Sequence, residues 1–105
     1  MLYSNTEMCL SNAIVCLSKR VSYDNDCSDN YTLAGLIGLL SQVNLDVALC
    51  EVEGQIKLLD EFYSQLDDAY FNGVISALYC SKMRRILDPV YGHFCILLYN
   101  LNEGA

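Results

Sequence analysis

The stretch LDVALCEVEGQIKLLDEFYSQL, residues 45–66, decides the fold of this chain. Its large apolar side chains recur at alternating spacings of four and three residues, at Leu45, Leu49, Val52, Ile56, Leu59, Tyr63 and Leu66. This spacing brings them to one face of an α-helix and is typical of a heptad seam. We therefore predict a long amphipathic helix that packs inside an intramolecular bundle. The alternative is a two-stranded coiled coil, which Tyr63 and the short run disfavour.

The two borders of this seam differ in chemistry. The acidic border consists of Asp46, Glu53, Asp60 and Asp67, and the opposite border of Ala48, Gln55 and Phe62. Because the acidic residues recur every seven positions, their carboxylates should form one line along the helix. We expect this line to face solvent, where charged side chains cost least.

Helical patterns cover most of the remaining chain. The predicted helices run from Ser4 to Arg20, from Thr32 to Val43, from Leu45 to Leu66, from Asp67 or Asp68 to Ile86, and from Pro89 to Leu101. The last boundary follows from Asp88 and Pro89, because Asp is a good N-cap and Pro is tolerated in the first turn. The expected fold is all-α, a single bundle of about five helices with short connections, with residues 1–105 as one acidic domain.

Composition narrows the choice of partner. The chain has 105 residues, of which 53% are apolar, enough for a real core. Thirteen acidic against six basic residues give a formal net charge of −7. Such a field repels the phosphates of nucleic acid and attracts basic proteins. A basic protein is therefore the expected partner.

No segment favours a membrane location. Residues 30–45 and 89–102 lack full charges, but each is shorter than the roughly 18 apolar residues that a span needs. The first residues include Glu7 and no basic region of the kind that opens a signal peptide. We expect a cytoplasmic protein that is a monomer or weak dimer.

Catalytic and metal sites find little support. Most of the six cysteines lie among apolar residues, so buried thiols are expected, with disulfides as the alternative. His93, the one histidine, has no partner at zinc-ligand spacing, and Cys80 has no evident general base. The acidic loop at 24–29 opens like a calcium loop, but Asp29 and Gly35 stand where Gly and Glu are required. We predict no enzyme activity, no metal and no cofactor.

The best candidate site is a corner where tyrosines flank carboxylates. Tyr and Asp together suit a binding hot spot for a basic protein, because Tyr supplies rigid contact area. The predicted partner-binding residues are Asp60, Tyr63, Asp67, Asp68 and Tyr70, with Asp24, Asp26 and Asp29 in support.

In size, acidity and helical character the chain resembles immunity proteins of bacterial contact-dependent inhibition and bacteriocin systems. The Tyr-Tyr-Pro segment of the helical immunity proteins of nuclease colicins is absent, so no residue roles carry over. The resemblance implies an inhibitor that neutralises a basic, nuclease-type toxin by placing carboxylates where phosphates would lie. The alternative is a secretion chaperone or adaptor that shields an apolar segment of another protein.

Overall fold

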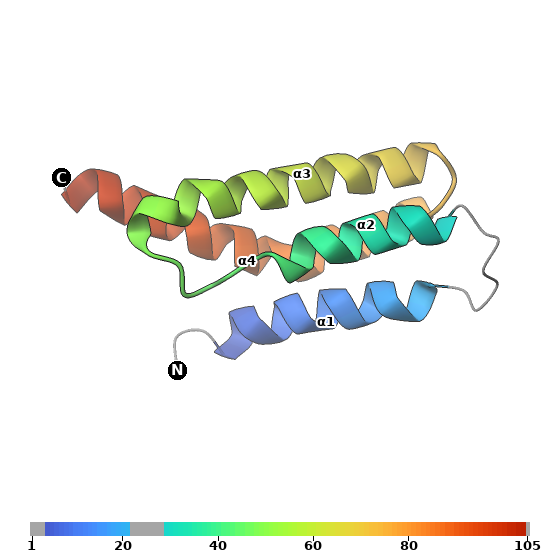
Figure 1. Cartoon of the computed structure of the whole chain (residues 1–105), viewed down its shortest axis with the longest axis horizontal. Helices are drawn as coiled ribbons and strands as arrows, with labels where there is room; N and C mark the ends of the chain where they lie inside the picture. The colour runs from blue at the N-terminus through green and yellow to red at the C-terminus, as the bar shows by residue number, and fades with distance from the viewer. Residues whose placement is uncertain (1–3, 22–28, 105) are drawn as a thin grey trace.

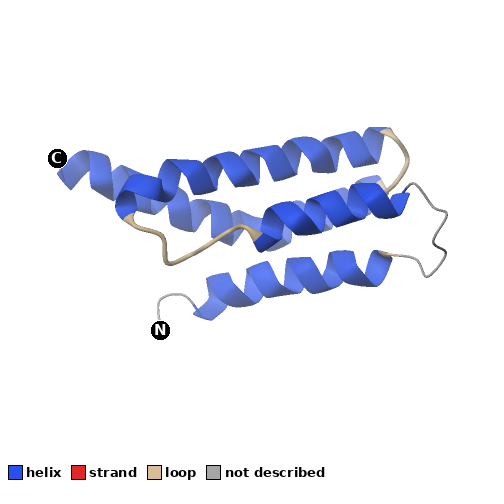
Figure 2. Cartoon of the chain, in the orientation of Figure 1, coloured by secondary structure: helices blue, strands red, loops and turns tan. Residues whose placement is uncertain are grey.

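Helices make up nearly all of the structure, a computed structural model that describes residues 4–21 and 29–104. The elements are α1 (Ser4–Arg20), α2 (Asp29–Ser41), the short 3-10 helix η1 (Leu49–Glu51), α3 (Val52–Phe71) and α4 (Ala77–Gly104). No strand occurs in these ranges (Figure 2). The all-α class is thus confirmed, with four α-helices in the described chain where the sequence predicted about five.

The four α-helices form an up-down-up-down bundle, in which each helix runs opposite to the one before it (Figure 1). Each helix packs against two others: α1 against α2 and α4, and α3 against α2 and α4. A single apolar cluster fills the space between them. This closed ring buries one face of every helix, as expected for a four-helix bundle.

The buried face of α3 keeps part of the predicted seam but is shifted toward Phe62 and Ala69. Its buried residues are Val52, Leu59, Phe62, Leu66 and Ala69. Phe62, predicted to border the seam, is fully buried, whereas Ile56 and Tyr63 are only half-buried. The apolar arc of α3 is wide, and its contacts with both α2 and α4 decide which part becomes the centre.

Helix α3 also begins later than predicted, at Val52 instead of Leu45. Asn44 competes with the helix here, because its side-chain oxygen accepts a hydrogen bond from the backbone N–H of Asp46 at 3.0 Å. Gln55 reaches back from α3 and accepts from the backbone N–H of Asn44 at 2.8 Å. Leu45 is still buried, but as an anchor of the loop.

A glycine turn separates α3, which ends at Phe71, from α4, which begins at Ala77. The sequence had instead predicted that the fourth helix begins at Asp67 or Asp68, directly after the third. Gly73 has φ +78°, a left-handed conformation that only glycine adopts without strain. The N–H groups of Gly73 and Val74 donate to the carbonyls of Tyr70 and Ala69, the pattern of a Schellman motif. Ser76 then caps α4 by accepting from the backbone N–H of Tyr79 at 3.0 Å.

The predicted fourth and fifth helices are one helix, because α4 continues through Pro89. Pro inside a helix removes one backbone hydrogen bond and costs about 3 kcal/mol. Against this cost, an apolar stripe runs unbroken past Pro89, through Met83, Leu87, Val90 and Phe94, all fully buried. Pro89 itself is exposed, so its ring does not disturb the core. Burial on both sides therefore outweighs the break that Asp88 and Pro89 predict locally.

Candidate functional site

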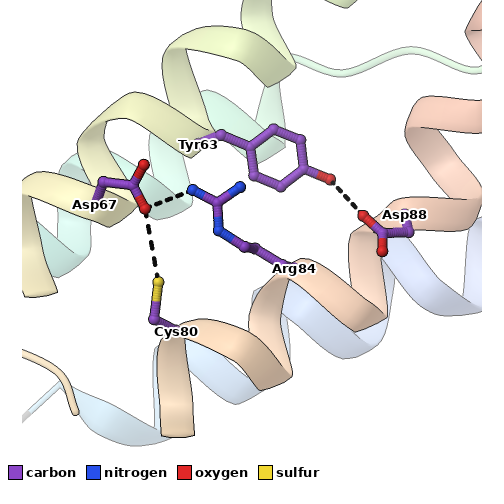
Figure 3. Close-up of polar contacts among 5 residues, drawn as sticks. All are labelled: Tyr63, Asp67, Cys80, Arg84 and Asp88. Carbon is purple, nitrogen blue, oxygen red and sulfur yellow. Dashed lines mark hydrogen bonds and ion pairs between the residues drawn. The ribbon is translucent and has the colours of Figure 1, made fainter. Parts of the chain in front are cut away.

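Polar contacts join α3 to α4 along the edge that the sequence predicted to be solvated. The two helices are antiparallel, so contact residues that come later along α3 pair with residues that come earlier along α4. The hydroxyl of Tyr91 donates to the Asp60 carboxylate at 2.9 Å, and Arg84 donates to Asp67 at 2.5 Å. Between them, the hydroxyl of Tyr63 points to Asp88 at a longer 3.5 Å (Figure 3). We call these three contacts the α3–α4 polar seam.

Tyr63 lies at the centre of this seam and is half-buried. The guanidinium of Arg84 lies 5.0 Å from the centre of its ring, within the range of a cation–π contact. The ring of Tyr91 also packs against the Tyr63 ring at a tilt, with ring centroids 5.8 Å apart. Burial, reinforced by the Asp88 carboxylate, raises the pKa of the Tyr63 hydroxyl, so this group stays neutral.

Asp67 accepts hydrogen bonds from two groups of α4 (Figure 3). Besides Arg84, the thiol of Cys80 approaches the same carboxylate oxygen at 3.8 Å. The hydrogen bond to Asp67 raises the pKa of the Arg84 guanidinium. Both side chains of the ion pair remain 39% to 45% exposed, so the pair holds the helices together only modestly, by about 1 kcal/mol or less.

Sequence reasoning missed the α4 side of this seam. Arg84, Asp88 and Tyr91 recur at spacings of four and three, which was a usable signal. The predicted break at Pro89 hid it, because Arg84 and Tyr91 then belonged to different helices. In the structure, the predicted binding residues Asp60, Tyr63 and Asp67 all contact side chains of α4.

The other two residues of the predicted corner are free of such contacts. Asp68 is exposed, and its carboxylate has no ion-pair or hydrogen-bond partner within residues 4–21 and 29–104. Tyr70 is 41% exposed and stacks at a tilt on Phe71, with ring centroids 5.4 Å apart.

Large apolar side chains gather at this end of the bundle. Phe71 at the end of α3 and Leu78 at the start of α4 are 79% and 82% exposed. Tyr31, in the first turn of α2, is 81% exposed at the same end of the molecule (Figure 1). A contiguous exposed apolar patch rimmed by polar groups marks an interaction site, so these side chains are candidates for one. We refer to Asp68, Tyr70, Phe71 and Leu78 as the α3–α4 tip.

Of the three supporting acidic residues of the predicted site, only Asp29 lies in the part of the chain that the structure describes. Asp24 and Asp26 lie outside the described residues, and Asp29 is the first residue of α2. The start of α2 lies at the same end of the bundle as the α3–α4 tip (Figure 1). Asp29 is therefore carried to the end where Asp68 and Tyr70 lie.

The cysteines of the described ranges are unpaired and differ in burial. Cys9, Cys16, Cys50, Cys80 and Cys95 are free thiols. Cys80 is the one buried thiol among these five, so the expectation of buried thiols holds for it alone. No cluster of three His, Cys, Asp or Glu side chains suited to a metal ion occurs in this part of the chain. None of the described helices combines the length and apolarity needed to cross a membrane.

Charge is distributed unevenly among the helices. Helix α3 has five acidic residues and one basic residue. Helix α1 has one acidic and two basic residues, and α4 has two acidic and three basic residues. The negative charge therefore concentrates on α3 and on the parts of the chain outside α1 and α4.

Comparisons with protein-family models, with curated proteins and with solved structures find no match for this chain.

Proposed function

We propose that the chain is an acidic binding protein that neutralises a basic partner, as the immunity protein or antitoxin of a nuclease-type toxin does. The observation that carries the proposal is the α3–α4 tip, which combines an unpaired carboxylate with exposed aromatic side chains at the end of the most acidic helix. Tyr70 and Phe71 can supply contact area, while Asp68 can meet a Lys or Arg of the partner.

Electrostatics gives this arrangement a physical advantage. A protein that binds phosphates must itself be basic, so an acidic surface attracts it over several ångströms and speeds their encounter. Rim carboxylates such as Asp68 act mainly on the association rate. Aromatic anchors that become buried in the complex, the role proposed for Tyr70, act mainly on the dissociation rate, and truncating a hot spot costs about 2 kcal/mol or more.

The α3–α4 polar seam supports the tip without being part of it. Asp60 and Asp67 already accept hydrogen bonds from α4, so a partner that used them would have to displace Tyr91 or Arg84. Asp68 requires no such exchange. We therefore assign the main binding role to Asp68 and Tyr70, and a secondary role to Asp60, Tyr63 and Asp67.

Affinity capture from the native host tests the proposal. The wild-type chain is used beside an Asp68→Lys, Tyr70→Ala double variant, with circular dichroism to show that both are folded. We expect the wild type to capture a basic protein and the variant to lose it. The captured protein, expressed alone, should stop growth, and co-expression of the wild-type chain should restore it. A harmless partner, or one held equally well by the variant, would argue against an inhibitor.

A secretion chaperone or adaptor is the second candidate, and the exposure of Phe71 and Leu78 favours it. Such a protein would hold an apolar segment of another chain, and charge would matter little. The same capture distinguishes the two functions. An adaptor's partner would be lost on Phe71→Ser with Leu78→Ser, would remain with Asp68→Lys, and would not be toxic.

A further inference from the structure

The groove between α1 and α4 differs in character from the acidic surface of α3. It is open and shallow, with a volume of about 290 Å³. Its lining consists of Asn12, Val15, Cys16 and Lys19 from α1, and Lys82 and Ile86 from α4. The groove is therefore bordered by one lysine from each helix.

Both lysines are available to a ligand. Lys19 and Lys82 are exposed, and neither forms an ion pair with any residue in the described ranges. The two helices that supply them carry more basic than acidic residues, in a chain whose net charge is −7. Two like charges at one groove repel each other slightly, and a bound anionic group would relieve this repulsion.

Most of the remaining groove lining is apolar, at Val15, Cys16 and Ile86, with Asn12 as the polar exception. Val15 is 50% exposed, and Ile86, which lines the same groove, is half-buried. Met8, seven residues before Val15 and hence on the same side of α1, is 60% exposed and extends the apolar strip. An aliphatic side chain placed on this strip would be sheltered from water.

We propose that this groove is a second binding surface, which takes an acidic, aliphatic segment of a partner protein. Carboxylates of the segment would pair with Lys19 and Lys82, and an aliphatic side chain would pack on Val15 and Ile86. The groove is too open to enclose a small ligand, which normally has most of its surface buried. Nucleic acid does not fit either, because two lysines do not offset the overall negative charge.

This surface goes beyond the proposed function, because its charge is opposite to that of the α3–α4 tip. Leu78 of the tip and Lys82 of the groove are one helical turn apart on α4, so the two surfaces adjoin each other near the same end of the bundle. A protein with both could join a basic partner to an acidic one.

A synthetic peptide tests the proposal with the whole chain. The probe is an amphipathic peptide of about twelve residues, with leucines at helical spacing and Glu beside them. Two matched peptides replace every Glu by Lys or every Leu by Ser. Binding is measured by shifts of backbone amide signals in nuclear magnetic resonance. We expect the Glu and Leu peptide to shift the residues of the groove, and both matched peptides to bind at least about tenfold more weakly.

Charge reversal then locates the site. Lys19→Glu and Lys82→Glu should each weaken the Glu and Leu peptide about threefold to tenfold. Lys57→Glu on α3 changes the net charge equally at another exposed position and should leave binding nearly unchanged. The proposal is overturned by the absence of shifts at the groove, by equal binding of the Ser peptide, or by an effect of Lys57→Glu as large as that of Lys82→Glu. Circular dichroism checks that every variant is folded.

Discussion

Leu59 lies in the middle of α3, and its side chain is fully buried in the core. Leu59→Ala should lower the free energy of unfolding by about 2 to 5 kcal/mol, because the truncation removes buried surface and leaves a cavity. Lys57→Ala, two residues earlier and exposed, should change it by about 0.5 kcal/mol or less. Urea unfolding measures both changes. Similar values for the two variants would mean that α3 presents a different face to the bundle.

Tyr63 makes stability depend on alkaline pH. Its pKa is raised in the folded protein, chiefly by burial, whereas an unfolded tyrosine titrates near its ordinary value of about 10. Above about pH 10 the unfolded chain therefore loses this proton first, and stability should fall as the pH rises. Burial raises the pKa of Tyr79 as well, so it adds to the same trend.

Tyr63→Phe should make that alkaline decrease less steep, because phenylalanine has no proton to lose. Urea unfolding of the wild type and the variant between about pH 8 and 11 provides the measurement. Equal slopes for the two proteins above pH 10 would show that the Tyr63 hydroxyl titrates alike in the folded and unfolded chains.

At the scale of single residues, the periodicity of the sequence predicted which residues form the core better than it predicted which residues form polar contacts. Leu59 and Leu66 were placed correctly in the core, because one helix is enough to define an apolar arc. Arg84 and Tyr91 were not assigned to the candidate site, because their partners lie on another helix. Such long-range pairs follow from how α3 and α4 are aligned, which no local pattern specifies.

Among the elements, α4 differs most from what local signals predict, and Pro89 provides a test. Pro89→Ala restores a backbone hydrogen bond within the helix, so it should stabilise the protein by about 1 to 3 kcal/mol. If Pro89 instead began a separate helix, the change would be neutral or destabilising, since Pro suits that position. Thermal and urea unfolding of the variant distinguish these outcomes.

Asp88→Ala is the companion to that test. An N-cap aspartate would contribute about 1 kcal/mol, whereas an exposed mid-helix aspartate contributes little. Among the described residues, the Asp88 carboxylate makes only the long contact with Tyr63, so a change of about 0.5 kcal/mol or less is expected. A loss near 1 kcal/mol together with a destabilising Pro89→Ala would restore the two-helix interpretation.

Sequence predicted the ends of a helix correctly where residues close to those ends in sequence determine them. Helix α1 begins at Ser4 and ends at Arg20, as its capping box and terminal basic residues predict. The turn after α3 was missed, although Asn72 and Gly73 are a typical turn pair. Asp67 and Asp68 are also good helix-capping residues, and this favoured an earlier boundary than the turn at Asn72 and Gly73. Asp67 instead pairs with Arg84 in the α3–α4 polar seam.

On the scale of the whole molecule, the all-α bundle was predictable and the division of its surface was not. Net charge alone indicated a basic partner. It did not show that α1 and α4 carry a basic groove while α3 carries most of the helical acidity. That division arises because the bundle brings together α1 and α4, which are far apart in sequence.

The central claim is that the α3–α4 tip captures a basic partner by charge and aromatic contact. The most direct measurement is the association rate with the captured partner as the salt concentration increases. Asp68→Lys is compared with Asp46→Lys, an equal change of charge at an exposed residue of the loop between α2 and α3, at the opposite end of the bundle (Figure 1). For the wild type the rate should fall roughly tenfold or more with salt, and Asp68→Lys should slow it far more than Asp46→Lys. A rate indifferent to salt, or equal effects of the two variants, would contradict the account.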